Sequence, residues 1–254
     1  KCDQRQRTGS FKFRGAYNAV ASLSPDMAGK SLVTVSSGNH GQALVLAARL
    51  HDRRATVVAP GAISEVKRAA ILAQGGEIIE TPTRDAAERE AQAWVGRGAA
   101  ILVHPFNDRH VIAGQGTCAL ELLAHVPDLD VVLAPVGGGG LLSGTCVAAH
   151  GLSPDIRIYA CEPVGALDAY YSVREHRVVP MLNPNTIADG LRSSLGSLTL
   201  EILHRHLAGF FTVEEWEIVD ALRFALERLS LVIEPSSAVA LAPLLREEPS
   251  LRGQ

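Results

Sequence analysis

A lysine between small and aromatic residues is the first group in this sequence that could do chemistry. Lys12 stands in the stretch TGSFKFRGA (8–16), ahead of a predicted helix at 16–23. Exposed to solvent, it would be an ordinary surface lysine, which is the commoner case. Partial burial would lower the pKa of its amine and allow it to form a Schiff base with a carbonyl compound. The motif alone leaves both interpretations open.

A second candidate is the loop SSGNHG (36–41), between a predicted strand at 31–35 and a predicted helix at 41–50. A helix N-cap would explain one serine or asparagine. Consecutive small or hydrogen-bonding residues throughout the loop exceed what a cap requires. Because backbone amides at a helix N-terminus attract anions, the loop suits a ligand such as a carboxylate.

A glycine-rich turn, PVGGGGLLSG (135–144), follows an apolar strand and precedes a predicted helix. Glycines allow backbone N–H groups to converge without obstruction by Cβ atoms, and the helix N-terminus adds positive potential. This context favours a phosphate cradle over a merely flexible turn. Because the Gly-Lys-Ser/Thr of a P-loop is absent, hydrolysis of nucleoside triphosphates is disfavoured.

Three further patterns are weaker. The GxGxxA match at 114–119 is rejected as a dinucleotide site, because residues 105–110 separate it from the preceding strand. Glu162 and Asp168 flank a turn and could bind a hard cation through oxygen atoms, although a solvated acidic loop is the commoner arrangement. His204 and His206 have the wrong spacing for one helical face, and neither HExxH nor GxSxG occurs.

An alternation of strands and helices must position these residues. Apolar runs predict strands at 31–35, 55–59, 77–80, 100–104, 130–135 and 157–162. Helices are predicted at 41–50, 64–74, 85–97, 116–125, 141–150, 213–229 and 236–245. Continuously apolar strands separated by helices indicate parallel sheets covered on both faces. The expected fold class is α/β with two lobes.

Composition limits the possible partners. The 254 residues include 47% hydrophobic and 20% charged residues, with a net charge of -3, which is typical of a globular protein. The absence of a Lys/Arg block argues against nucleic acid and membrane partners. No apolar run approaches the ~20 residues of a membrane span, and no signal peptide is expected because a polar segment comes first. The four cysteines form no CxxC pair, so we expect a reducing, cytoplasmic location.

Together these motifs resemble the fold-type II pyridoxal-phosphate (PLP) enzymes, and among them the serine/threonine dehydratase and serine racemase family. The stretches in family order are TGSFKFRGA, SSGNHGQA, VIAGQGT, PVGGGGLLSG, ADGL (188–191) and EPSSA (234–238). The resemblance implies a two-lobed, tryptophan synthase β-like fold. A small α/β domain would comprise 31–107, and a large PLP-binding domain would comprise 1–30 and 108–254.

The resemblance also implies roles for individual residues. Lys12 would hold PLP as a Schiff base and then act as the base at Cα, and Ser37 would be the second acid/base on the opposite face. Asn39 would bond the PLP 3′-oxygen. The phosphate would be bound by Gly137, Gly138, Gly139, Gly140 and the Leu141 amide. The substrate carboxylate would be surrounded by Ser36, Ser37, Asn39 and His40, with Arg89 also reaching the substrate.

The implied metal site consists of Glu162, the carbonyl of Ala166 and Asp168, holding a divalent cation such as Mg²⁺, Mn²⁺ or Ca²⁺. Here the resemblance favours a cation over the solvated loop. A homodimer is expected on the same ground.

The expected activity is that of a PLP-dependent lyase. It would convert L-serine, L-threonine or a related β-hydroxy amino acid, such as 3-hydroxyaspartate, to a 2-oxo acid and ammonia. Serine racemase is the alternative, since both reactions begin with removal of the Cα proton. A non-catalytic ligand-binding relic is a third interpretation. It arises because family members have a segment before the position of Lys1 and a C-terminal strand whose Ser or Thr meets the pyridine nitrogen. We expect these segments to exist in the protein.

Overall fold

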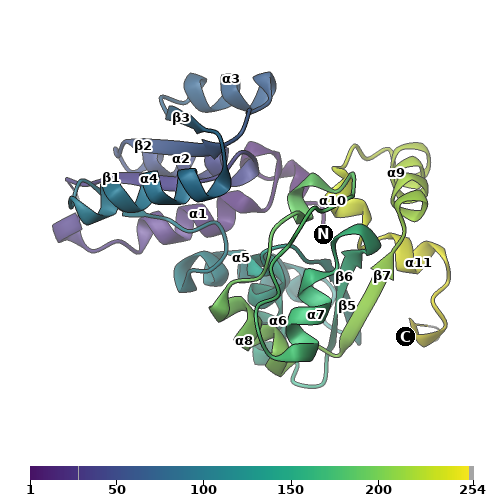
Figure 1. Ribbon diagram of the computed structural model, residues 1–254. Coiled ribbons are helices and arrows are strands. Elements are labelled where there is room, and N and C mark those ends of the chain that lie inside the picture. Colours follow the sequence, from purple (N-terminus) through teal and green to yellow (C-terminus); the bar gives the residue numbers. More distant parts are fainter. Residues whose placement is uncertain (28, 252–254) are drawn as a thin grey trace. The chain divides into compact units, whose positions relative to one another are not determined.

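The computed structural model describes residues 1–27 and 29–251. The chain forms two compact units, Lys1–Gln115 and Gly116–Gln254 (Figure 1). Each unit contains one parallel sheet with helices packed against it, which confirms the α/β fold class. In the part of the chain that the structure describes, no helix is both long and apolar enough to cross a membrane.

The sheet of the first unit has four strands in the order β3 (Glu77–Thr81), β2 (Ala55–Pro60), β1 (Ser31–Val35), β4 (Ala100–Leu102). Its helices are α1 (Lys12–Ala21), α2 (Asn39–Leu50), α3 (Glu65–Ala73) and α4 (Arg84–Gly96), and α5 (Arg109–His125) begins in this unit. Leu32 and its neighbours pack against α1, α2 and α3 on one face, whereas Val33 and its neighbours pack against α4 on the other. Burial of both faces explains why these strands are continuously apolar.

The sheet of the second unit has three strands in the order β5 (Val131–Pro135), β6 (Arg157–Pro163), β7 (Gly209–Val213). Its helices are α6 (Gly140–Leu152), α7 (Asp168–Glu175), α8 (Ser197–His206), α9 (Glu215–Leu229), α10 (Pro235–Ala238) and α11 (Ala242–Leu245). Ile158 on β6 lies in a core with α6, α7 and α8, and Cys161 on the same strand lies in a core with α9 and α10.

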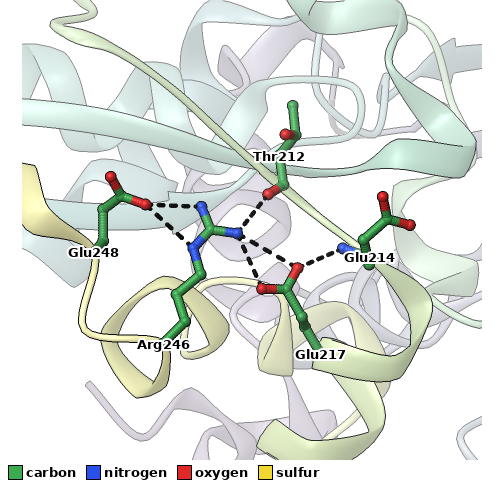
Figure 2. Close-up of polar contacts among 5 residues, drawn as sticks. All are labelled: Thr212, Glu214, Glu217, Arg246 and Glu248. Carbon is green, nitrogen blue, oxygen red and sulfur yellow. Dashed lines mark hydrogen bonds and ion pairs between the residues drawn. The ribbon is translucent and has the colours of Figure 1, made fainter.

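Arg246 ties the end of α11 to β7 and α9 (Figure 2). Its guanidinium donates to the carbonyl of Thr212 at 3.0 Å and to a carboxylate oxygen of Glu217 at 3.0 Å. Glu217 also accepts a hydrogen bond from the backbone N–H of Glu214 at 2.7 Å, which caps α9. Thr212 pairs with Glu162 of β6. The network therefore steadies the strand beside the one that carries Glu162.

The structure corrects three predicted helices and adds strand β7, which is not predicted. The sequence pattern does not predict strand β7, because its aromatic residues directly precede a helix; they pair with β6, Phe211 opposite Cys161. The predicted helix at 236–245 is two short helices, and Pro243 stands in the first turn of the second, where a missing N–H is tolerated. Helix α1 begins at Lys12 rather than at residue 16. Helix α5 begins at Arg109 rather than at residue 116, so the GxGxxA match lies inside a helix and its rejection is confirmed.

Residues before β1 pack within the first unit, where Phe13 and Ala16 share a core with Leu44. The predicted domain division differs from these two units, because it assigns residues 1–30 to the large domain. That division, with limits at 31 and 107, stays a prediction.

Candidate active site

Lys12 is the first residue of α1, and its amine is enclosed by protein although the residue keeps some exposed surface. The Nζ atom donates a hydrogen bond to the carbonyl of Pro105 at 2.9 Å. Burial lowers the pKa of this amine from 10.5 to about 8. A surface lysine would keep the higher value, so that interpretation is wrong. Close to neutral pH, about one tenth of such an amine is neutral and nucleophilic.

The loop from Ser36 to Gly41 connects the carboxyl end of β1 to α2. The Ser36 hydroxyl accepts hydrogen bonds from the backbone N–H groups of Gly38 at 3.2 Å and Gly41 at 3.3 Å. The Ser36 side chain therefore fixes the shape of the loop. Ser37 is exposed, and Asn39 is the first residue of the helix. Their predicted contacts with a substrate carboxylate stay predictions.

His40 is fully buried behind this loop. Its Nε2 lies 3.3 Å from the carbonyl of Val103, and since a carbonyl only accepts, Nε2 carries the hydrogen. Burial lowers the pKa of His40 to about 3, and the positive charge of Lys12 contributes less. His40 is therefore a neutral imidazole that holds the start of α2 against the end of β4.

His104 is a candidate that the sequence interpretation missed. It follows β4, and its Nδ1 accepts hydrogen bonds from the backbone N–H groups of Phe106 at 3.3 Å and Asn107 at 2.9 Å. Burial lowers its pKa to about 4, with smaller contributions from Arg84 and Lys12. His104 is thus neutral with its hydrogen on Nε2. Its position just beyond a parallel strand, where ligands of α/β proteins bind, could have identified it.

Arg89 is exposed on α4, whose packed face carries Ala87 and Ala91. Its position two residues from each of these alanines places it on the opposite side of the helix. Among the residues that the structure describes, no contact ties Arg89 to the other candidates, and its predicted role stays a prediction.

In the second unit, Gly137, Gly138, Gly139 and Gly140 connect β5 to α6. Gly139 has φ 85°, a conformation that side chains disfavour, and a Cβ there would lie 2.9 Å from Thr199 Cβ. A Cβ on Gly137 would lie 3.0 Å from the carbonyl oxygen of Gly190. The Thr199 hydroxyl donates to the carbonyl of Gly138 at 2.9 Å and so holds the loop. Gly137 and Gly139 are therefore sterically required, and the loop fits a phosphate group at the N-terminus of α6.

Two motifs far apart in the sequence meet beside this loop. The backbone N–H of Gly190, in ADGL, donates to the hydroxyl of Ser236, in EPSSA, at 2.9 Å. Gly190 also lies close to Gly137, because a Cβ atom on Gly137 would be only 3.0 Å from the carbonyl oxygen of Gly190. Three of the motifs on which the resemblance depends, PVGGGGLLSG, ADGL and EPSSA, thus build one region of the second unit.

Glu162 and Asp168 form a buried acidic pair. The Glu162 carboxylate accepts hydrogen bonds from the backbone N–H groups of Ala169 at 2.8 Å and Tyr170 at 2.9 Å. Neither oxygen of Asp168 accepts a hydrogen bond of ordinary geometry from the residues that the structure describes. Burial raises the pKa of Glu162 to about 8 and that of Asp168 to about 7, against smaller opposing effects of nearby backbone N–H groups.

The interpretation of this segment as a solvated acidic loop is therefore wrong, since both side chains are buried. A buried carboxylate without a partner is costly, and a cation would remove that cost. Ala166 lies between the two acids in a short 3-10 helix. Within the described residues no three His, Cys, Asp or Glu side chains gather as metal donors, so a cation here would also need carbonyl or water ligands.

Comparison with known proteins identifies relatives over the whole chain. The family of pyridoxal-phosphate dependent enzymes matches residues 1–254. A serine racemase from Dictyostelium discoideum is 44% identical over 251 residues, 98% of this chain and 78% of the racemase. A beta-hydroxyaspartate dehydratase from Paracoccus denitrificans (strain Pd 1222) is 42% identical over 258 residues, 100% of this chain and 81% of the dehydratase.

The solved structures agree. The crystal structure of a T.th. threonine deaminase matches with a TM-score of 0.91 and 40% identity, covering 98% of this chain and 82% of the deaminase. These matches confirm the resemblance based on the six motifs. The chain belongs to the pyridoxal-phosphate-dependent enzymes of fold type II, in the serine/threonine dehydratase and serine racemase family.

Proposed function

We propose that this chain is a PLP-dependent dehydratase that converts L-serine, L-threonine or a related β-hydroxy amino acid to a 2-oxo acid and ammonia. The observation that carries the proposal is the enclosed Lys12 amine, whose lowered pKa makes it a competent base near neutral pH. The relatives named serine racemase, beta-hydroxyaspartate dehydratase and threonine deaminase support the substrate class.

Different residues of this chain bind the cofactor and move the proton. When bound, PLP withdraws electrons from the Cα of an attached amino acid. Lys12 would hold the cofactor through Nζ and, once the amino group of the substrate has taken its place, the freed Nζ would remove the Cα proton. The backbone N–H groups of Gly137, Gly138, Gly139, Gly140 and Leu141 would bind the phosphate, and Asn39 would bond the 3′-oxygen. Departure of the β-hydroxyl then commits the substrate to elimination.

The loop after β1 orients the substrate carboxylate through its N–H groups, with Ser37 and Asn39 at its surface and Arg89 as a further predicted contact. Ser36 and His40 hold the loop in place. The Ser36 hydroxyl already accepts hydrogen bonds from two N–H groups of the loop, and the His40 Nε2 already donates to the carbonyl of Val103. A rigid array of N–H groups loses little entropy when an anion binds.

Racemisation is the second candidate, and the exposure of Ser37 favours it. An exposed hydroxyl in the loop that binds the carboxylate could return a proton to Cα on the face opposite Lys12. Elimination and racemisation then compete after the same proton removal, and the ratio depends on whether protonation precedes loss of the β-hydroxyl.

We also infer a divalent cation held by Glu162, the Ala166 carbonyl and Asp168. The unpartnered oxygens of Asp168 support it, and an all-oxygen donor set suits Mg²⁺, Mn²⁺ or Ca²⁺. A homodimer in the cytoplasm is inferred from the family resemblance and the scattered cysteines.

The test is a product assay on the purified, PLP-loaded protein with L-serine, L-threonine and 3-hydroxyaspartate, measuring 2-oxo acid and D-amino acid separately. Lys12→Ala is expected to abolish both products, whereas Lys30→Ala, a matched change elsewhere in the same unit, is expected to keep them. Formation of neither product by the loaded wild-type protein, together with ligand binding that survives in Lys12→Ala, would instead support the non-catalytic interpretation.

A further inference from the structure

Four histidines gather at the C-terminal ends of three helices in the second unit. His150 lies in the last turn of α6, His204 and His206 lie in the last turn of α8, and His176 directly follows α7. These helices lie side by side in that unit (Figure 1). The spacing of His204 and His206 directs them to different neighbours: His204 meets His176, and His206 meets His150.

The two pairs differ in their spacing. The ring centroids of His150 and His206 are 5.1 Å apart, whereas those of His176 and His204 are 3.7 Å apart. With Zn–N bonds of about 2 Å, two imidazoles that share a tetrahedral ion have centroids about 5 Å apart. The centroid spacing of the His150–His206 pair is therefore compatible with two ligands of one metal ion, whereas the His176–His204 pair is too close.

The ring of His150 is also held as a metal ligand requires. Its Nδ1 lies 2.9 Å from the carbonyl of Cys146, one turn earlier in α6. Because the carbonyl only accepts, Nδ1 carries the hydrogen and Nε2 keeps its lone pair. A backbone carbonyl that fixes the far nitrogen is the usual outer partner of a metal-bound histidine.

The helix ends favour a cation. Both rings lie where a helix ends and the backbone carries partial negative charge. The adjacent positive charge of Arg205 opposes a cation and is balanced only in part by Glu201, whose carboxylate lies 3.4 Å away. Both histidines are only half-buried, so an ion can reach them from solvent.

We propose that His150 and His206 form a two-histidine site for a transition-metal ion such as Zn²⁺ or Ni²⁺. Imidazole nitrogens prefer these ions to Mg²⁺ and Ca²⁺. The described residues contain no group of three His, Cys, Asp or Glu donors, so water fills the remaining coordination positions. The site is separate in ligand chemistry from the oxygen donors Glu162 and Asp168 and does not depend on the proposed reaction.

The test is calorimetric titration of the PLP-loaded protein with Ni²⁺, in excess Mg²⁺ and in a Cys2→Ser background that removes the exposed thiol. We expect about one Ni²⁺ ion per chain. His150→Gln and His206→Gln each remove a direct ligand and are expected to weaken binding roughly tenfold or more, since loss of an outer partner alone costs that much. His204→Gln, the matched control on the same helix, is expected to leave the affinity unchanged.

A second measurement, NMR spectroscopy of the histidine rings, uses the protein without substitutions at its histidines. Bound Ni²⁺ is paramagnetic and is expected to broaden the ring C–H resonances of His150 and His206 before those of His176 and His204. Absence of binding at millimolar Ni²⁺ would overturn the proposal. Unchanged affinity in His150→Gln and His206→Gln, or an equal loss in His204→Gln, would overturn it as well.

Discussion

The buried ionisable groups of the two units differ in the direction of their pKa shifts and in their hydrogen-bond partners. In the first unit, burial lowers the pKa values of Lys12, His40 and His104, and each of these side chains is bonded to a backbone group. In the second unit, burial raises the pKa values of Glu162 and Asp168, and the Asp168 oxygens accept no hydrogen bond of ordinary geometry from the described residues.

The contrast separates two functions. The Lys12 amine, with its pKa lowered to about 8, can accept a proton near neutral pH in its neutral form, whereas His40 and His104, with pKa values of about 3 and 4, stay neutral and act through their hydrogen bonds. The Asp168 carboxylate, which lacks an ordinary hydrogen bond from the described residues, would gain a partner from a bound cation, whereas Glu162 already accepts hydrogen bonds from two backbone N–H groups. We therefore propose proton transfer as the role of the first unit, and binding of charged ligands, by these acids and by the glycine loop before α6, as the role of the second.

The largest expected effect concerns proton delivery in the first unit. Ser37→Ala is expected to lower racemisation about a hundredfold, the typical contribution of a positioned acid or base, and to lower elimination far less. The measurement is the rate of D-serine and of pyruvate formation from L-serine.

Ser36→Ala is the matched control. Its hydroxyl accepts from two loop N–H groups, so its removal is expected to reduce both rates by a similar factor. Equal losses of racemisation and elimination in Ser37→Ala would show that Ser37 acts on the loop, as Ser36 does, rather than as an acid.

A smaller effect concerns pH. In the proposed role of Lys12, its neutral amine attaches to the cofactor, and burial lowers the pKa of this amine to about 8. The rate at which PLP becomes attached to the apoprotein is therefore expected to rise about tenfold per pH unit below pH 8 and to level off above it. Stopped-flow absorbance measures this rate. A rate that continues to rise to pH 10 would mean that the amine behaves as an exposed lysine.

The smallest effect concerns the second unit. Saturating Mg²⁺ is expected to raise the melting temperature of the wild-type protein by about 5–10 °C, because a cation at a hundred times its dissociation constant stabilises the fold by roughly 3 kcal/mol. Asp168→Asn keeps the shape of the side chain but removes its charge, so it is expected to respond little. Differential scanning calorimetry with and without chelator measures both proteins. An unchanged wild-type melting temperature would contradict the cation site.

Local sequence is sufficient to predict where the loops lie, but not the burial or the pKa of the side chains in them. The glycine turn before α6 and the loop after β1 are predictable because strand, loop and helix are contiguous in the chain. The apolar strands are predictable because both faces of each sheet are buried. Strand β7 escapes prediction because its pairing with β6 requires residues far away in the sequence.

Burial of Lys12 is not predictable for the same reason. Its partner is the carbonyl of Pro105, 93 residues further along the chain. The burial of Glu162 and Asp168 likewise depends on the packing of α7, which no pattern near these acids reveals. Tertiary contacts decide the pKa of a side chain, whereas its position in a motif does not.

The most direct test of the central claim is borohydride reduction of the PLP-loaded protein, followed by peptide mapping with mass spectrometry. The account predicts that the visible absorption band disappears on reduction and that the cofactor's mass is found on the peptide containing Lys12. Attachment to Lys30 or Lys67 instead, or recovery of the Lys12 peptide unmodified from a fully loaded sample, would contradict the assignment of Lys12 as the cofactor-binding base.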